Sequence, residues 1–377
     1  LIVHGFQDSE PSVASLSSSI LEYQRENGRR YHALSRGKYV LPNDEDENNR
    51  LDLQHELYVR TMHGELALCP KAQGARNVLD MGTGTGQWAI SYGMGTTPHF
   101  PTIPCMILGS SLVGSPVTVC NTDLEPAADL HPEAHVIGVD LSPIQPDFHD
   151  SISQPIASYG TRDDSRPAYA DSVLSAAHLS VPPNLNFEID DLEKEWTWSH
   201  KFDFIFARMM LGCFENLPAM MKVAYDNLEP GGYIEFQDMA LPARSDDGTL
   251  DPNSYLSKWC DACLEAGQNL GRPVWPVVEY KNYLADAGFE CIVEVQKKWP
   301  TNTWPRDSNF KELGMWAYAN IAGSLEGLSL AYFARGLGWT PDEIRVFCAH
   351  TRKDLKDPKI HAYWPIYVVY GRKPFDA

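Results

Sequence analysis

Long hydrophobic runs and positive charge are the two features that this sequence has least of. No stretch of about 18 apolar residues occurs, so the sequence predicts no transmembrane helix. The 31 lysines and arginines are outnumbered by 50 acidic residues, which gives a formal net charge of −19. Because such a chain repels nucleic acid phosphates and anionic lipids, we expect neither nucleic acid nor a membrane as a direct partner. The printed sequence shows no basic-then-apolar signal segment, and we expect a cytoplasmic or nuclear location rather than secretion.

Metal-ligand patterns are also missing. The eight cysteines are scattered, and the CxxC pair of Cys260 and Cys263 has no second pair or histidines at suitable spacing. His131 and His135 are four residues apart, but Pro132 between them argues against a helix that would bring them together. The sequence therefore predicts free thiols in a reduced compartment and no metal site.

Apolar residues are plentiful, at 43% of 377 residues, which is enough for one large α/β domain with additions or for two domains. The Ser-rich residues 1–18 are predicted to be a disordered tail. Residues 19–72 are predicted to be an N-terminal helical segment, with a short helix within 19–35 and an amphipathic helix that begins near Leu51. Residues 73–377 are predicted to form the main domain.

Short apolar strands alternate with helices in this main domain. A helix is expected over 217–228, because apolar residues recur there at helical spacing and Pro218 suits the first turn. Such alternation predicts an α/β fold with a doubly wound, parallel sheet. The expected strands are 77–81, 136–140, 185–189, 202–206 and 233–236, followed by two late strands at 291–295 and 366–370.

The strongest local motif is a glycine loop, GTGTG at 82–86, that directly follows the first strand. Glycines permit positive φ and a close approach of the backbone to a ligand, and amides at the start of the next helix face an anionic group. The spacing is GxGxG, and Gln87 stands where the dinucleotide fingerprint needs glycine, which favours S-adenosylmethionine over NAD. A glycine turn without a ligand is the alternative. The candidate cofactor-binding residues here are Asp80, Gly82, Thr83, Gly84, Gly86 and Trp88.

Acidic residues follow the next two strands. Asp140 ends the second strand, where a carboxylate accepts hydrogen bonds from both ribose hydroxyls; the alternative is a helix N-cap, a role that Ser142 can fill instead. Asp190 and Asp191 follow the third strand and are candidates to accept a hydrogen bond from an adenine amino group; a solvated acidic turn is the alternative. The set of candidate cofactor-binding residues is completed by Leu141, beside Asp140, and Arg208, after the fourth strand.

Together these segments resemble the class I S-adenosylmethionine-dependent methyltransferases. More narrowly, they resemble the fungal LaeA-like methyltransferases, which are linked to regulation of secondary metabolism. The upstream stretches NGRRYH and KYVLPNDE, Trp304-Pro305 and the stretch to Gly371-Arg372 are similar to that family as well. The segments that carry the resemblance are VLDMGTGTGQW, VIGVDLSPIQP, NFEIDD, FDFIFARMM and LEPGGYIEFQD.

The resemblance implies a Rossmann-like methyltransferase sheet of seven strands, the last antiparallel, with S-adenosyl-L-methionine as cofactor. It makes residues 73–377 the methyltransferase domain, in which segments 240–290 and 300–357 form a helical cap over the mouth of the site. Aromatic residues of this cap are candidates to line a substrate pocket, with plain core as the alternative: Trp299, Trp304, Trp316, Tyr318 and Trp339.

Two segments do not fit the resemblance. Residues 93–129 and 147–180 are rich in Pro, Gly, Ser and Thr, and show no helical or strand period. The first one separates Asp80 from Asp140 by far more than the usual spacing of about 20 residues. We hypothesise that both are translated introns, with genuine insertions as the alternative. Because 93–129 interrupts the helix that begins at Gln87, we expect this chain to bind its cofactor poorly even where its family binds well.

Three functional hypotheses follow. The first is methyl transfer from S-adenosyl-L-methionine to an unidentified small molecule or protein side chain. The second is a non-catalytic regulatory protein that uses the cofactor fold to dock protein partners, and the third is an NAD-dependent oxidoreductase. No catalytic base can be named, because Glu235, Gln237, Asp238 and Arg208, near the expected mouth, fit structural roles better.

Overall fold

The computed structural model describes residues 23–35, 37–95, 133–146 and 181–377. The predicted tail at 1–18, His131, residues 96–129 of the first odd segment and all of the second odd segment, 147–180, lie outside the described residues. Residues 93–95 are described, and they belong to the end of a helix rather than to the odd segment. In the described part of the chain, no helix is both long and apolar enough to cross a membrane.

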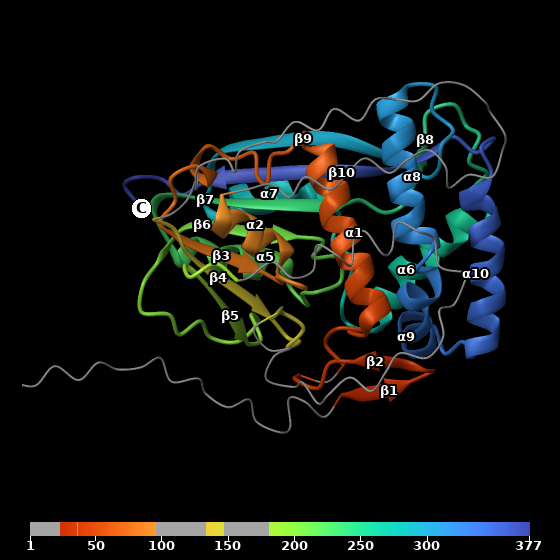
Figure 1. The fold of residues 1–377 in the computed structure, drawn as a ribbon, viewed down its shortest axis with the longest axis horizontal. Helices are drawn as coiled ribbons and strands as arrows, with labels where there is room; N and C mark the ends of the chain where they lie inside the picture. Colours follow the sequence, from red (N-terminus) through yellow and green to blue (C-terminus); the bar gives the residue numbers. More distant parts are fainter. Residues whose placement is uncertain (1–22, 36, 96–132, 147–180) are drawn as a thin grey trace, which may run out of the picture.

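A central sheet carries the fold, in the spatial order β5-β4-β3-β6-β7-β10, with β9 along the other edge of β10 (Figure 1). The strands β3 to β7 are mutually parallel, and β10 runs antiparallel to both β7 and β9. The expected seven strands with an antiparallel last strand are therefore confirmed, and a two-residue strand, β8, adds to them. The bounds are β3 Asn77–Met81, β4 His135–Asp140, β5 Leu185–Ile189, β6 Phe202–Arg208, β7 Leu228–Met239, β8 Arg244–Ser245, β9 Glu290–Pro300 and β10 Ala362–Arg372.

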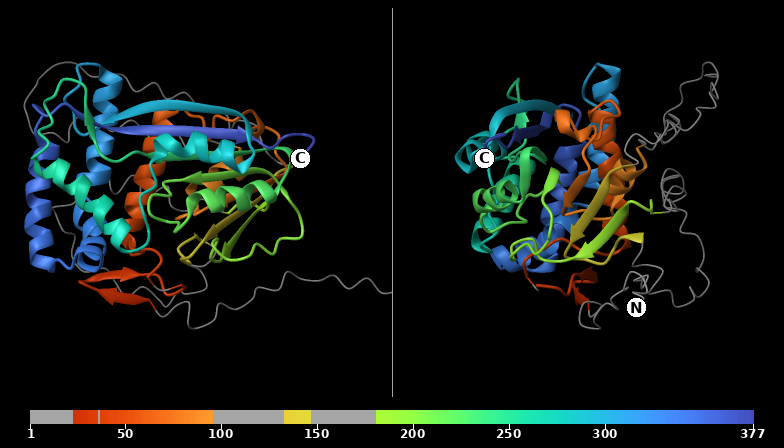
Figure 2. Two further views of the ribbon diagram at one scale, coloured as in Figure 1. Left: turned by 180° about the vertical axis from the view of Figure 1, so that it is seen from behind. Right: turned by 90° about the vertical axis from the view of Figure 1, so that its left-hand side faces the viewer.

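Helices cover both faces of this sheet (Figure 2). One face carries α2 (Gln87–Met94), whose Trp88 ring stacks on Phe206 of β6 at a centroid distance of 3.8 Å. The other face carries α5 (Leu217–Asp226) and α7 (Tyr280–Ala287), and the short 3₁₀ turn η3 (Val277–Glu279) directly precedes α7. The 3₁₀ turn η1 (Pro70–Ala72) packs with α2, where the Ala72 carbonyl accepts the Tyr92 hydroxyl. The α5 helix begins where the sequence predicts it, with the Asn216 side chain accepting the Ala219 amide.

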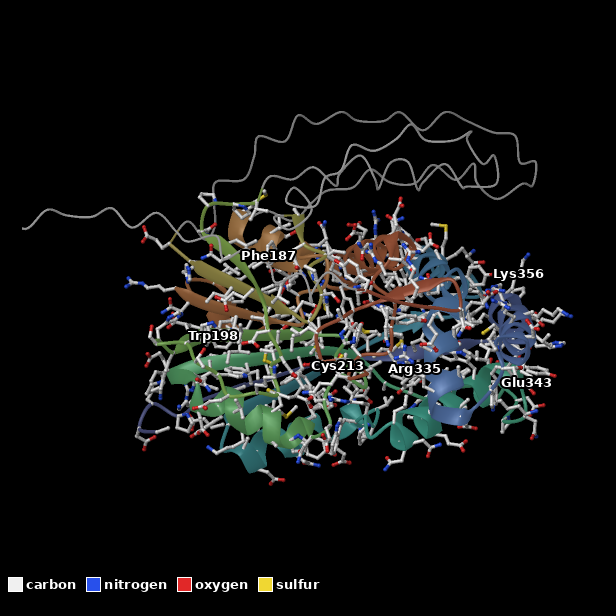
Figure 3. The ribbon with its side chains drawn as sticks, turned by 90° about the horizontal axis from the view of Figure 1, so that it is seen from below. Phe187, Trp198, Cys213, Arg335, Glu343 and Lys356 are labelled. Carbon is white, nitrogen blue, oxygen red and sulfur yellow. The ribbon has the colours of Figure 1, made fainter. Side chains whose placement is uncertain are left out.

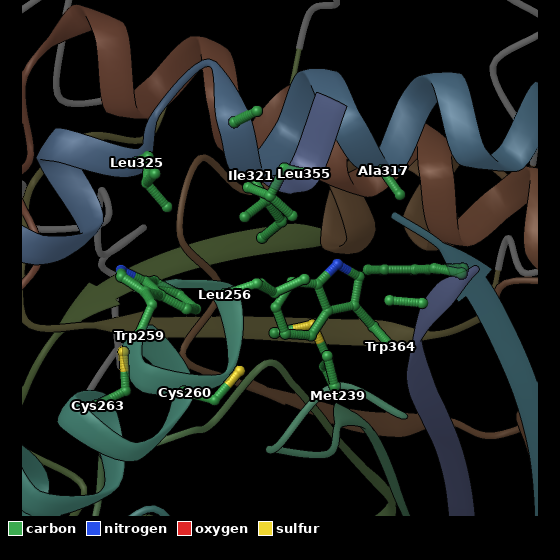
Figure 4. Packing of buried hydrophobic residues seen from close by; sticks show 14 of the residues in the cluster. Met239, Leu256, Trp259, Cys260, Cys263, Ala317, Ile321, Leu325, Leu355 and Trp364 are labelled. Carbon is green, nitrogen blue, oxygen red and sulfur yellow. The ribbon is translucent and has the colours of Figure 1, made fainter. Parts of the chain in front are cut away.

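Four further helices form a cap at one end of the sheet (Figure 1). They are α6 (Tyr255–Asn269), α8 (Ser308–Ala322), α9 (Leu325–Leu337) and α10 (Pro341–Lys356). The cap has its own apolar core, in which Trp259 and Leu256 of α6 meet Ile321 of α8 and Trp364 of β10 (Figure 4). The last strand therefore belongs to both the sheet and the cap, and it joins them into one body.

The helix α1 (Glu45–Thr61) lies between the cap and the sheet (Figure 1). Its Tyr58 hydroxyl donates to the Gln237 carbonyl of β7 at 3.2 Å, and its Thr61 hydroxyl accepts the Trp299 indole N–H of β9 at 2.7 Å. Acidic residues fill its first turn, and the Asp44 side chain caps it. These contacts fix the helix against the ends of the parallel strands.

The expected helix within 19–35 is wrong. Residues 24–31 form a hairpin of β1 (Gln24–Glu26) and β2 (Arg29–Tyr31) instead. Asn27 and Gly28 both adopt positive φ, 52° and 80°, which is the backbone of the tight two-residue turn that Asn-Gly favours. The Arg29 guanidinium then donates to the Asp44 carboxylate at 2.6 Å, which fastens the hairpin to the start of α1. The N-terminal segment is thus a hairpin followed by one helix.

Candidate functional site

A cavity opens where β3, β4, β5 and β6 end, bounded by the sheet, α1 and the cap. Cys213, which lines it, lies between the strands and the cap helices (Figure 3). Of the sequence-predicted site residues, Gly86 does not line the cavity; it is the residue that precedes α2. The cavity brings together the other ten: Asp80, Gly82, Thr83, Gly84, Trp88, Asp140, Leu141, Asp190, Asp191 and Arg208.

The glycine loop is held in a single shape by its own strand ends. Gly82, Gly84 and Gly86 have φ of 69°, 58° and 83°, values that side-chain-bearing residues rarely adopt. The Thr83 hydroxyl donates to the Asp80 carboxylate at 2.6 Å, and the Thr83 amide donates to the Val139 carbonyl at 2.9 Å. Thr83 therefore ties the loop to both β3 and β4, and the Thr85 hydroxyl ties it to α1 by donating to the Asp52 carboxylate at 2.6 Å.

Phe187 of β5, which Figure 3 labels, explains why Gly86 and Gly138 cannot carry a side chain. A Cβ added at Gly86 would lie 2.5 Å from this ring, and one added at Gly138 would lie 2.8 Å from it. The aromatic ring therefore packs directly on the backbone of the loop and of β4, and supports the floor of the cavity.

Asp140 binds the backbone of the glycine loop and also lines the cavity. One carboxylate oxygen accepts the Gly84 amide at 2.9 Å, and the other accepts the Ser142 amide at 2.9 Å. Burial raises the pKa of this carboxyl to about 6, although its backbone hydrogen bonds act in the opposite direction. Each oxygen has a further lone pair. The Asp140 carboxylate thus accepts an amide of the turn that follows β4, much as an N-cap residue does. It also lines the cavity.

The two acids after β5 have different surroundings. Asp191 is buried and accepts from the Lys38 ammonium at 2.6 Å and from the Ser35 hydroxyl at 2.7 Å. Although burial raises the pKa of Asp191, these hydrogen bonds lower it overall. Asp190 is exposed, and one of its oxygens accepts the Asp191 amide at 2.7 Å. Asp191 therefore fastens the N-terminal segment to β5, whereas Asp190 faces the cavity and solvent.

Asp80 and Arg208 lie on neighbouring strands at the centre of the site. Burial raises the pKa of the Asp80 carboxyl to about 7, while the Thr83 hydrogen bond and the charge of Arg208 act in the opposite direction. The Arg208 guanidinium donates to the His55 ring at 3.0 Å and lies 5.0 Å from the centre of the Tyr58 ring. Both His55 and Tyr58 belong to α1, so this helix helps to form the site.

Sequence reasoning missed the whole N-terminal contribution to the cavity. The stretch 38–43 lines it, and so do Leu51, Gln54 and His55 of α1. Two signals were available. The stretch KYVLPNDE resembles the family, and the spacing of Leu51, His55 and Tyr58 places a histidine on the apolar side of a predicted helix. Such a position is more often a buried structural residue than part of a site, so the pattern alone does not identify it.

An apolar chamber lies next to the strand ends, lined by the residues that follow β6, by the end of β7 and by residues of the cap. None of the expected cap aromatics, Trp299, Trp304, Trp316, Tyr318 and Trp339, lines the cavity. Trp299, for example, is fully buried in the cap core with its indole bonded to Thr61, so the core alternative holds for it. The residues that form the chamber are Met209, Met210, Leu211, Phe214, Met239, Leu241, Trp259, Cys263, Val274, Ile321, Leu328 and Tyr332.

The polar residues at the end of β7 have structural partners. Both oxygens of Glu235 accept the Leu68 amide, and the Gln237 amide donates to the Leu66 carbonyl at 3.1 Å. Asp238 accepts the Met210 amide at 2.7 Å and the Tyr280 hydroxyl at 2.9 Å. None of these three side chains lines the cavity. In the part of the chain that is described, the cysteines are unpaired and no cluster of His, Cys, Asp and Glu is suited to a metal ion.

Comparison with known proteins identifies the family. Residues 52–294 match the family described as Methyltransferase domain. Methyltransferase pytC of Aspergillus terreus is 31% identical over 368 residues, covering 98% of this chain and 93% of that protein. The secondary metabolism regulator LAE1 of Cochliobolus heterostrophus is 30% identical, covering 93% and 94%. Protein-methionine methyltransferase laeA of Emericella nidulans is 28% identical, covering 98% and 82%. The chain therefore belongs to the methyltransferase family, and the resemblance to LaeA-like proteins is confirmed.

The raised pKa of Asp80 predicts how stability depends on pH. A carboxyl whose pKa is raised from 3.8 to about 7 binds its proton more tightly in the folded state, so its stabilisation is lost as pH rises through about 7. Asp80→Asn carries no such charge. We expect the free energy of unfolding of the variant, relative to the wild type, to increase by about 1–3 kcal/mol from about pH 5 to about pH 8.

Urea unfolding of the ligand-free protein at several pH values measures this difference. Asp226→Asn is the matched control, since Asp226 is exposed at the end of α5 and pairs with Lys222. Parallel pH curves for wild type and Asp80→Asn would show that the Asp80 pKa is not raised.

Proposed function

We propose that the cavity binds S-adenosyl-L-methionine across the ends of four adjacent strands. The order β5-β4-β3-β6 places Asp190, Asp140, the glycine loop and Arg208 in a row. Asp190 is then at the adenine amino group, Asp140 at the ribose hydroxyls and the loop at the methionyl part. The hydrogen bond between the Gly84 amide and Asp140 is the observation that carries this proposal, because it joins the two binding elements.

The bound sulfonium supplies the electrophilic methyl group. The residues of this chain hold the acceptor in line with it and exclude water, which are the two main contributions that methyl transfer needs from a protein. The apolar chamber is suited to both tasks. Met209 and Met210 follow β6 directly, so the chamber begins where the row of cofactor-binding residues ends.

The acceptor that fits this chamber is an uncharged, apolar group of a small molecule or of a protein side chain. The ionisable groups among its lining residues are one thiol and one phenol, and burial raises the pKa of Cys263 and of Tyr332. Neither is a general base near neutral pH. The acceptor therefore needs a nucleophilic atom that is reactive without proton removal by these residues. That relatives are named as a methyltransferase, a protein-methionine methyltransferase and regulators of secondary metabolism supports a place in secondary metabolism.

A second candidate is a regulatory protein that docks partners with little turnover. The names of the LAE1 and laeA relatives support it. Transfer of a labelled methyl group from S-adenosyl-L-methionine to fungal metabolite and protein extracts separates the two functions.

A net charge of −19 supports the absence of a nucleic acid or membrane partner, and we retain the cytoplasm or nucleus as the proposed location.

We further propose that the segments 93–129 and 147–180 are insertions that the methyltransferase domain does not need, and the residues that flank the first segment support this. The Asn184 amide donates to the Gly93 carbonyl at 3.3 Å and to the Ala134 carbonyl at 2.9 Å. One side chain therefore reaches both the end of α2 and the start of β4, a gap that a few residues bridge at about 3.5 Å each. This supports the translated-intron hypothesis, which sequencing of the mature transcript tests directly.

Deletion of 96–132 tests the same idea in the protein. With Gly95 joined to Glu133, we expect S-adenosylhomocysteine to bind at least as tightly as it binds the full chain, because all the residues that form the cavity are retained. Isothermal titration calorimetry of both proteins gives the comparison. Loss of binding in a deletion variant that still folds, by circular dichroism, would contradict the proposal.

Replacing Asp140 tests the cofactor site. Asp140→Ala removes the ribose acceptor together with the anchor of the Gly84 amide, so we expect S-adenosylhomocysteine binding to weaken by about 1–3 kcal/mol. Asp226→Ala, which removes an exposed carboxylate away from the cavity, serves as the control. Unchanged affinity in folded Asp140→Ala would refute the assignment.

A further inference from the structure

Arg208 has an unusual charge environment. It ends β6 and lines the cavity, and its guanidinium lies against the Tyr58 ring at 5.0 Å and the Phe206 ring at 5.9 Å. Its one hydrogen bond to another side chain is to the neutral His55 ring. Among the described residues, no aspartate or glutamate forms an ion pair with it. Burial lowers the pKa of Arg208, which reflects the cost of keeping this charge away from water.

The nearest acid does not balance this charge in full. The Asp80 carboxylate accepts the Thr83 hydroxyl, and burial raises its pKa to about 7, which leaves it partly protonated near neutral pH. A guanidinium carries five N–H groups, of which one is bonded to His55. Arg208 is half-buried and has no acidic partner within the described ranges, so its charge is incompletely solvated and an anion that enters the cavity stabilises the site.

The strand order places this cation at a specific distance from the ribose site. β4, β3 and β6 are adjacent, and Met81 of β3 pairs with Ala207, next to Arg208. With strands about 4.8 Å apart, the ends of β4 and β6 are on the order of 10 Å apart. A ligand whose ribose lies at Asp140 and whose chain crosses the glycine loop therefore brings its far end to Arg208.

We infer that Arg208 binds the carboxylate of the bound methyl donor, and that His55 is the residue that positions it. This inference rests on the proposed S-adenosyl-L-methionine site. Guanidinium and carboxylate match as a planar, two-point pair, and the donor has one carboxylate, at the end opposite its adenine.

His55 has the properties of a positioning residue. Because a guanidinium can only donate, the His55 Nδ1 that faces it at 3.0 Å is an acceptor, and the ring proton is on Nε2. Nε2 faces the Ser91 hydroxyl of α2 at 3.5 Å. Burial, together with the charge of Arg208, lowers the pKa of His55 well below its usual value, so the ring stays neutral. His55 thus orients the guanidinium without neutralising it, so the positive charge of Arg208 can pair with the ligand carboxylate.

Two ligands separate the carboxylate from the rest of the donor. S-adenosylhomocysteine carries the amino-acid end, and 5′-methylthioadenosine has the same adenosyl thioether without it. Titration calorimetry with both measures what the amino-acid end, with its carboxylate and its ammonium group, contributes, and the Arg208 variants then isolate the carboxylate. For Arg208→Met we expect S-adenosylhomocysteine to bind about 10- to 100-fold more weakly, the range for a charged hydrogen bond, and methylthioadenosine to bind as it does to the wild type. Arg208→Lys, which keeps the charge, should lose less.

A matched pair of variants tests His55. Gln and Glu have the same size, so His55→Gln supplies a neutral acceptor and His55→Glu supplies a charged one that neutralises Arg208. We expect His55→Gln to bind S-adenosylhomocysteine within a few-fold of the wild type. We expect His55→Glu to lose about tenfold or more, with methylthioadenosine binding unchanged in both.

The outcomes distinguish this inference from the proposed function. If the wild type binds both ligands and Arg208→Met weakens them equally or not at all, Arg208 is not the carboxylate site. If His55→Glu binds S-adenosylhomocysteine as well as His55→Gln does, the positive charge of Arg208 does not contribute to ligand binding and the role given to His55 is wrong. If the wild type binds neither ligand, the cofactor site itself is wrong, and the inference falls with it.

Discussion

The hydrogen bond from the Gly84 amide to the Asp140 carboxylate is the contact on which the site depends. It joins the loop after β3 to the end of β4, and it does so with a carboxylate that still faces the cavity. Phe187 of β5 packs under the same loop, where Gly86 and Gly138 leave room for its ring. Three strands therefore fix one loop in its positive-φ shape. A preformed site of this kind does not have to be ordered when the ligand binds.

Much of the fold could be predicted from the sequence, because hydrophobic periodicity and glycine punctuation are local signals. The parallel strands, the glycine loop and Asp140 follow from such signals in β3 and β4. The hairpin at 24–31 was missed although Asn27-Gly28 is a strong turn signal, since the apolar residues before it also suit a helix. A local pattern also does not distinguish an aromatic residue of the core from one that lines a cavity, so the sequence did not show that Trp299 belongs to the cap core.

The rest of the site could not be predicted, since it depends on contacts between segments far apart in the chain. His55 and Arg208 are separated by 153 positions, and Lys38 and Asp191 by the same number. A local pattern places neither pair together. The contact between His55 and Arg208 depends on how α1 packs against the strand ends, and buried contacts such as the one between Thr61 and Trp299 determine this packing. The charge balance at Arg208 is likewise a property of the assembled cavity.

A crystal structure of this chain with S-adenosylhomocysteine bound tests the central claim most directly. The account predicts that the adenosyl group lies across the glycine loop, with the ribose hydroxyls about 3 Å from the Asp140 carboxylate oxygens. A ligand found elsewhere on the protein, or a loop and an Asp140 that remain apart from it, would contradict the account.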